Sequence, residues 1–181
     1  MKKYQRPEIA KHSFYFHFLI LTLIFALPTN GQFLNFQINI EAELSTAVER
    51  PMDFGTFIIN SGPNTIELGD PRMGIFRIDA LRTQRILMSL EVPEYLRQEF
   101  GPESARIPVE LFAAFSNFGE DNWRTAQVFR TPLQEIIIEP PQNNPEAIWS
   151  AAYIYIYGMI DIGAIPEGVY TGDIVLSIIY E

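Results

Sequence analysis

The sequence predicts an all-β protein, an immunoglobulin-like antiparallel β-sandwich of about nine short strands that follows an N-terminal signal helix. Two observations lead to this fold class. Most apolar segments after residue 33 alternate apolar and polar side chains, which is the period of a strand with one buried face. Clusters of Gly, Pro, Asn and Asp separate these segments at short intervals, and no βαβ alternation is present.

The first 31 residues are expected to be a secretory signal peptide. A basic start precedes a 14-residue apolar run, Phe14–Leu27, that ends at Pro28. As a helix this run reaches about 21 Å at about 1.5 Å per residue, short of the roughly 30 Å of a bilayer core. We therefore expect cleavage between Gly31 and Gln32, membrane contact only before cleavage, and one domain over residues 32–181.

The strands are expected in order along this domain, and the cleanest alternation is the first. Its apolar face is formed by Leu34, Phe36, Ile38, Ile40, Ala42 and Leu44. Turns are expected at Ala47–Pro51 and Asn60–Asn64, and a loop at Pro93–Arg106 with one helical turn at Glu94–Glu99. Further strands are expected at Asp53–Ile59, Thr65–Leu68, Ile75–Ala80, Ile86–Val92, Ile107–Ser116, Leu133–Glu139 and Ile148–Tyr157, the last continuing past Gly158 to Ile165.

The C-terminal stretch combines a turn signal with a last strand. Pro166 and Gly168 suit the second and fourth positions of a β-turn. The strand that follows places Ile174, Leu176, Ile178 and Tyr180 on one strongly apolar face. Such a strand is typical of a two-layer sandwich.

Two motifs in this chain resemble a known family. Pro166, Gly168, Tyr170 and Gly172 form a Pro-x-Gly-x-Tyr-x-Gly turn before the last strand, and Asp53, Phe54 and Gly55 form an early "hydrophobic-Asp-Phe-Gly" strand. Together they are similar to the bacterial secreted family of domain of unknown function 4402. The resemblance covers roughly Phe33 to Glu181 and implies a pilin-related, immunoglobulin-like sandwich outside the cytoplasm, without an established activity.

The mature chain is acidic and lacks three residue types that many enzymes use. Both histidines, His12 and His17, lie in the signal segment, and residues 32–181 contain no Cys, no Lys, nine Arg and 21 acidic residues, a net charge of −12. This composition excludes Ser-His-Asp and Cys-His nucleophiles, Lys Schiff bases and His or Cys metal sites. The charge also repels nucleic-acid phosphates. We expect a non-enzymatic protein without cofactor, metal or nucleic-acid partner.

Polar and aromatic clusters leave weaker alternatives. Two carboxylates near turns could form a glycoside-hydrolysing pair; the candidates are Asp70, Glu120, Asp121 and Asp161. However, a chain with 21 acidic residues brings carboxylates close together by chance. The tip Gly119–Asn122 lacks the full calcium-loop pattern, which favours a solvated loop. The row Tyr153, Tyr155 and Tyr157 suits cross-strand packing better than sugar stacking, as do Trp123 and Trp149.

The two ends of the domain suggest assembly. In chaperone-usher pilus subunits, an alternating N-terminal extension completes the sandwich of the next subunit by strand addition. Their last strand has a penultimate aromatic residue and a glycine fourteenth from the end, as Tyr180 and Gly168 are here. The chain departs from them by lacking a disulfide. The alternative is that Leu34–Leu44 pairs within its own domain.

These observations predict a secreted bacterial protein of the periplasm, outer surface or extracellular space. We expect a structural or adhesive surface subunit of the pilus type, whose partners are copies of itself or a periplasmic chaperone. The alternative is a self-contained extracellular module that binds a glycan or a protein.

Overall fold

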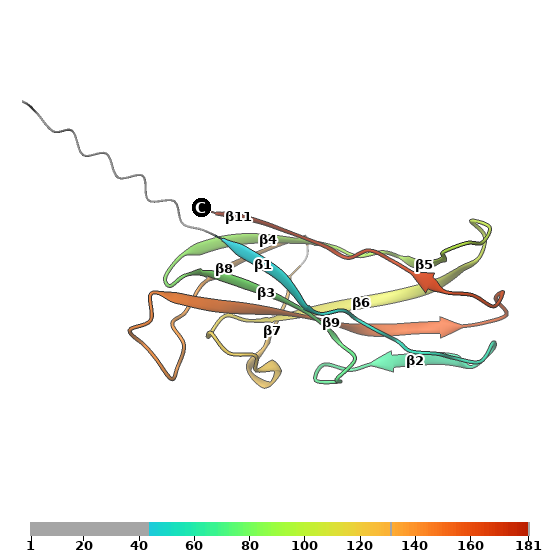
Figure 1. Cartoon of the computed structure of the whole chain (residues 1–181), viewed down its shortest axis with the longest axis horizontal. Coiled ribbons are helices and arrows are strands. Elements are labelled where there is room, and N and C mark those ends of the chain that lie inside the picture. The colour runs from blue at the N-terminus through green and yellow to red at the C-terminus, as the bar shows by residue number, and fades with distance from the viewer. Residues whose placement is uncertain (1–43, 131, 181) are drawn as a thin grey trace, which may run out of the picture. The chain divides into compact units, whose positions relative to one another are not determined.

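The computed structural model describes residues 44–130 and 132–180, all within the unit Glu41–Glu181. These residues form eleven β-strands and one short 3-10 turn, η1 (Figure 1). The strands are β1 (Ser45–Arg50), β2 (Gly62–Ile66), β3 (Gly74–Leu81), β4 (Arg85–Glu91), β5 (Tyr95–Gln98), β6 (Arg106–Ser116), β7 (Gln127–Val128), β8 (Leu133–Ile137), β9 (Trp149–Ile162), β10 (Tyr170–Thr171) and β11 (Val175–Tyr180), with η1 (Trp123–Thr125) before β7.

The strands form two antiparallel sheets, so the expected β-sandwich is confirmed. The larger sheet has the order β1-β3-β9-β6-β5-β10, with β2 added beside β9 and β7 beside β6. The smaller sheet has the order β11-β4-β8. A core of buried side chains from β3, β4, β6, β8 and β9 lies between the two sheets.

The long strand β9 organises the larger sheet. One of its edges pairs with β3 and then with β2, and the other edge pairs with β6. Ala152, Ile154 and Ile156 face the smaller sheet. The opposite face of β9 is covered by a second cluster that includes Leu68, Met73 and Trp123. Burial on both faces explains why this stretch is almost continuously apolar instead of alternating.

The two sheets are joined by a bent pair of strands. β4 continues through Pro93 into β5, and β11 is preceded by β10 on the other side of Gly172. β4 pairs with β11 in the smaller sheet, and β5 pairs with β10 in the larger one. A Cβ atom at Gly172 would lie 3.0 Å from Cγ of Pro93, so glycine lets the two backbones approach closely at the bend.

The expected strand Asp53–Ile59 lies outside any strand, and the expected turn Asn60–Asn64 contains the start of β2. Two further local expectations were also wrong. Most of the expected turn Ala47–Pro51 belongs to β1, which pairs with β3 and contains a bulge between Val48 and Arg50. The expected helical turn Glu94–Glu99 contains β5, because Leu96 packs on a buried cluster at the end of the sheet while the backbone pairs with β6. In both places the partner strand decides the conformation. The strand count is eleven in the described residues, above the nine expected.

The segment Leu34–Ala42 and the signal segment with its cleavage site at Gly31 and Gln32 lie outside the described residues. Leu44 is described, and its half-buried side chain packs against the main core. No helix within residues 44–130 and 132–180 has the length and apolar character needed to cross a membrane.

Candidate functional site

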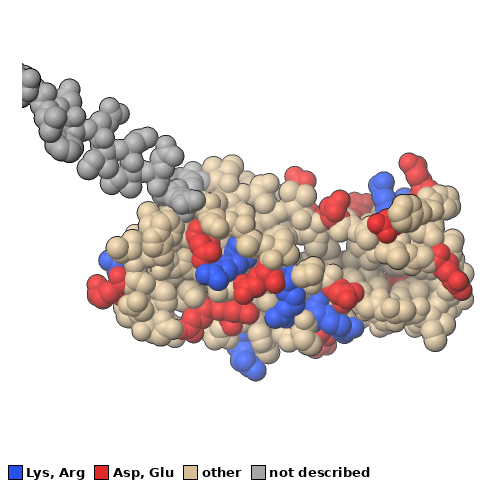
Figure 2. Space-filling view, in the orientation of Figure 1, with Lys and Arg blue, Asp and Glu red and all other residues tan. Residues whose placement is uncertain are grey.

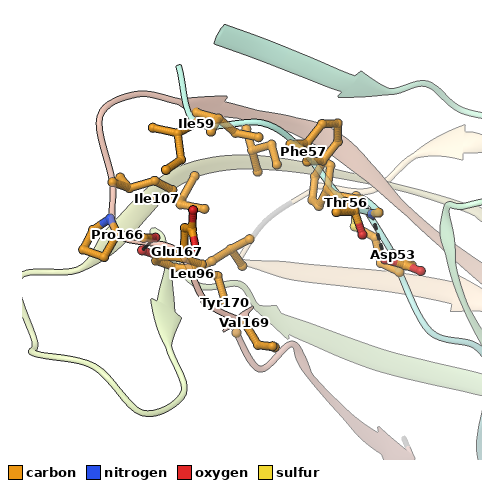
Figure 3. A pocket seen from close by; sticks show the side chains of 18 of the residues that line it. Asp53, Thr56, Phe57, Ile59, Leu96, Ile107, Pro166, Glu167, Val169 and Tyr170 are labelled. Atoms are coloured by element: carbon orange, nitrogen blue, oxygen red, sulfur yellow. Dashed lines mark hydrogen bonds between the residues drawn. The ribbon is translucent and has the colours of Figure 1, made fainter. Parts of the chain in front are cut away.

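A pocket of about 550 Å³, lined mostly by apolar residues beside polar backbone and carboxylate groups, opens between two segments that are far apart in the sequence (Figure 3). Its floor is formed by the buried side chains Ile107, Ile160 and Ile162. Phe57 and Ile59 lie on one wall, and Pro166 and Tyr170 lie on the other. This volume is within the range of about 300–1,000 Å³ that is typical of ligand pockets.

The first wall is the segment Met52–Ile59, of which Asp53–Ile59 was expected to be a strand but lies outside any strand. Asp53 fixes its bend, since Gly55 N–H donates to Asp53 Oδ1 at 2.8 Å and Gly55 has φ +90°. Asp53 N–H donates to the Arg72 carbonyl oxygen at 3.1 Å. Within the described residues, the N–H groups of residues 56–59 have no hydrogen-bond partner. This wall therefore offers unpaired backbone to an extended chain.

The second wall is the turn before β10. The Tyr170 hydroxyl donates to the Pro166 carbonyl oxygen at 2.8 Å, which closes the turn. Gln98 Nε2 donates to the Glu167 carbonyl oxygen at 2.7 Å, and a Cβ atom at Gly168 would collide with the same amide group. The turn is thus held against β5 by a contact that requires glycine.

The two motifs of the family resemblance meet at this pocket. The two motifs lie more than a hundred positions apart in the chain, yet residues of both line the pocket: Asp53, Phe54, Gly55, Pro166, Tyr170 and Gly172. Gly168 lines it as well. The sequence contained both motifs but no signal that they are neighbours, because the pairings of β9 and β10 bring them together.

Strand β11 has a free edge within the described residues. It pairs with β4 on one side, and the sheet ends there on the other. Leu176 and Ile178 point inward but are only half-buried, whereas their partners Leu90 and Met88 on β4 are buried. Among the described residues, no further strand covers the side of β11 away from β4, which accounts for the difference in burial.

The pocket ends next to this open edge, because Ile174, the residue before β11, is part of its lining. Met52 and Ile174 line the pocket and also pack on the main core. Leu44, Leu176 and Ile178 pack on the same core as half-buried residues. We call the pocket together with the open edge of β11 the β11 groove. Of the C-terminal strand residues, Gly168 and Ile174 line the pocket, and Leu176 and Ile178 lie on the edge strand. Only the backbone of Tyr180 is described.

The aromatic residues weighed as binding platforms are largely part of the packing. Tyr153 and Tyr155 are buried beneath the second cluster. Burial and the nearby Asp121 carboxylate raise the pKa of Tyr155, so its phenol stays neutral. The Trp123 ring lies against Gly69, where it leaves no room for a Cβ atom. Trp149 is the more accessible tryptophan, with 49% of its surface exposed.

Charged side chains outside the groove form ion pairs. Arg72 binds Asp70 at 2.9 Å and Arg77 binds Asp79 at 2.8 Å, and both signs lie side by side on the face in Figure 2. Hydrogen bonds from Arg72 lower the pKa of Asp70. No group of three or more His, Cys, Asp or Glu side chains within the described part of the chain is arranged to hold a metal ion.

The sequence did not predict the floor of the pocket, formed by Ile107, Ile160 and Ile162, or Leu96 beside it. The alternation of Ile160 and Ile162 was visible in the sequence. It indicates a buried face, but a buried face and the floor of a pocket have the same pattern.

Comparisons with known proteins give a weak structural likeness. No protein-family model matches the chain, and no curated protein matches it. Among solved structures, a chain from a study titled "Chaperone-tip adhesin complex is vital for synergistic activation of CFA/I fimbriae biogenesis" is 9% identical, with a TM-score of 0.38. The match covers 76% of this chain and 42% of that one. A likeness this weak assigns neither fold nor function.

Proposed function

We propose that the protein is a secreted, non-enzymatic structural or adhesive subunit of the bacterial surface, and that it assembles by β-strand complementation. The strand Leu34–Leu44 of one copy fills the β11 groove of the next. The observation that carries the proposal is the open edge of β11, where inward-facing Leu176 and Ile178 are half-exposed beside fully buried partners on β4.

An added strand would satisfy both walls of the groove. Its backbone would pair with the free edge of β11 and with the unpaired N–H groups of residues 56–59. Its apolar face would cover Leu176 and Ile178 and extend into the pocket. Leu34–Leu44 has the required alternation of apolar and polar residues, and full burial of each large apolar side chain contributes roughly 1.5–3 kcal/mol before ordering costs.

The secretory destination rests on the N-terminal sequence. The basic start and apolar run before Pro28 are typical of a signal peptide, and the absence of Cys removes any need for disulfide formation outside the cell. Membership of the family of domain of unknown function 4402 stays a prediction that the two motifs support.

The test uses the intact mature chain, residues 32–181, and two matched pairs of variants. On the donor strand, Ile38→Asp places a charge on the apolar face and Asn39→Asp places it on the polar face. On the acceptor, Ile178→Asp faces the groove and Ile179→Asp faces solvent, where Ile179 is 62% exposed. Size-exclusion chromatography with light scattering measures assembly.

We expect the unaltered chain, Asn39→Asp and Ile179→Asp to form oligomers whose size rises with concentration. Ile38→Asp and Ile178→Asp should each be monomeric, and mixing them should give a 1:1 complex, because one supplies an intact groove and the other an intact donor. A chain that stays monomeric at all concentrations and binds no peptide spanning Phe33–Leu44 contradicts the proposal. If Ile38→Asp instead lowers the stability of a monomer, the strand pairs within its own domain.

A further inference from the structure

Three loops gather at the end of the domain where the pocket opens (Figure 1). They comprise residues 51–61, 99–105 and 163–169. Asn60 N–H donates to the Gly163 carbonyl oxygen at 3.1 Å, and Glu99 N–H donates to the Val169 carbonyl oxygen at 2.9 Å. These bonds join each outer loop to the central one, so the three loops form one continuous surface, which we call the loop-end surface.

Each loop exposes a large apolar side chain on this surface. Phe100 is 94% exposed, Ile58 is 83% exposed and Val169 is 62% exposed. Phe100 and Ile58 have the highest exposed fractions among the large apolar residues of the described chain. Single exposed apolar side chains are common, but several gathered on joined loops indicate an interaction site.

The loop-end surface is also negative. Its loops carry three acidic residues away from any basic residue of the same loops: Glu99, Glu103 and Glu167. Asp53, near the start of the first loop, lies beside Arg72 instead. Arg97 and Arg106 flank the second loop on β5 and β6, and the Arg106 guanidinium stacks on the Tyr95 ring at 4.8 Å. Acidic side chains predominate toward this end of the face in Figure 2.

We propose that the loop-end surface docks a segment of a partner protein that carries apolar side chains beside Lys or Arg. Charge complementarity selects this partner, because apolar contacts supply affinity while the three carboxylates attract cations. A second copy that docked through the same surface would bring like carboxylates together, and an anionic lipid surface is also repelled. The inference goes beyond assembly, since Ile58 and Phe100 lie outside the lining of the β11 groove.

The probe is a fluorescently labelled, N-acetylated eight-residue peptide of alternating Lys and Leu, added to the mature chain carrying Ile38→Asp. This variant is expected to be monomeric whether or not the unaltered chain assembles. The peptide test therefore does not depend on the complementation proposal. Comparison peptides alternate Glu with Leu and Lys with Ser. Anisotropy measures binding at physiological ionic strength, where charges more than about 8 Å apart are largely screened.

We expect the Lys–Leu peptide to bind more tightly than either comparison peptide. The double variant Ile58→Ser with Phe100→Ser should weaken binding by about tenfold or more. Ile148→Ser is the matched control, since Ile148 is 65% exposed but lies on the loop between β8 and β9. It should leave binding unchanged. A second variant, Glu99→Gln with Glu167→Gln, should weaken binding and reduce its dependence on salt.

Four results would overturn the proposal. Equal peptide binding by the Ile58→Ser with Phe100→Ser chain and by the Ile148→Ser chain means that the peptide is attracted by net charge alone. If the Glu–Leu peptide binds as tightly as the Lys–Leu peptide, the charge of the partner does not determine binding. Phe100-dependent binding to phosphatidylglycerol vesicles, or Phe100-dependent dimerisation of the Ile38→Asp chain, assigns the surface to lipid or to a second copy instead.

Discussion

The hydroxyl of Tyr170 donates a hydrogen bond to the carbonyl oxygen of Pro166, four residues earlier, at 2.8 Å. The bond spans the turn before β10 and resembles the tyrosine corner found in many β-sandwiches. It explains why proline and tyrosine stand together in the C-terminal motif: Pro166 sets the turn, and Tyr170 closes it from the first position of the next strand.

Removal of this hydroxyl should destabilise the domain without altering its packing. Tyr170→Phe is expected to lower the free energy of unfolding by about 1 kcal/mol, which is the usual net value of one hydrogen bond. Urea unfolding followed by circular dichroism measures the change. Tyr95→Phe is the control, because Tyr95 is 39% exposed and its hydroxyl has no hydrogen-bond partner within the described residues. Equal effects of the two substitutions would show that the turn does not need the bond.

A side chain at Gly158 should damage the centre of the larger sheet. A Cβ atom there would collide with the Glu110 carbonyl oxygen on β6, and the backbone of β6 cannot rotate away as a side chain can. Gly158→Ala should destabilise the protein by about 3 kcal/mol. Gly163→Ala meets open space and should change stability by less than about 0.5 kcal/mol. Thermal melts of the two variants compare them directly.

Gly69 and Trp123 should be energetically coupled. Gly69 has φ +97°, and a Cβ atom on it would lie 2.7 Å from the Trp123 ring. Gly69→Ala is therefore expected to be destabilising, and to cost about 1 kcal/mol less when Trp123→Ala has already removed the ring. The cost that remains is the strain of positive φ. A double-mutant cycle by chemical denaturation measures the coupling, and strictly additive effects would contradict the contact.

The Asp70–Arg72 pair predicts a stability difference that depends on pH. Hydrogen bonds from Arg72 N–H, Nε and Nη2 lower the pKa of Asp70 below its ordinary value. A carboxylate with a lowered folded-state pKa adds stability above its unfolded pKa and loses it as the pH falls through the folded value. Asp70→Asn should thus be less stable than the unaltered chain at neutral pH, with a difference that shrinks under acid. Urea titrations between neutral and acidic pH test this, and a constant difference contradicts it.

The sequence predicted those strands whose faces differ clearly in burial. Strand β4 alternates between buried Ile86, Met88 and Leu90 and more exposed neighbours, so its pattern was readable. Strand β1 has exposed side chains over almost its whole length, and only its backbone pairing with β3 makes it a strand. Such an edge strand leaves no periodic signal in the sequence.

The sequence predicted the residues of the candidate site but not that they lie together in space. The inward row of β11 followed from alternation, and the two motifs followed from a family resemblance. Their meeting at one pocket depends on pairings between residues about a hundred positions apart, such as Asn64 with Ile160. Local propensity carries no information at that separation. The proposed donor residues before Leu44 lie outside the described residues, so their role stays a prediction.

The position of β9 in the chain has a consequence for the timing of folding. β2, β3 and β6 all pair with β9, yet β9 begins only at Trp149 of 181 residues. When a chain emerges from its N-terminus, these three earlier strands must wait for their common partner with open backbone edges and exposed apolar faces. Because unpaired edges of this kind aggregate readily, the hazard lasts until about four-fifths of the chain has emerged and ends when β9 arrives.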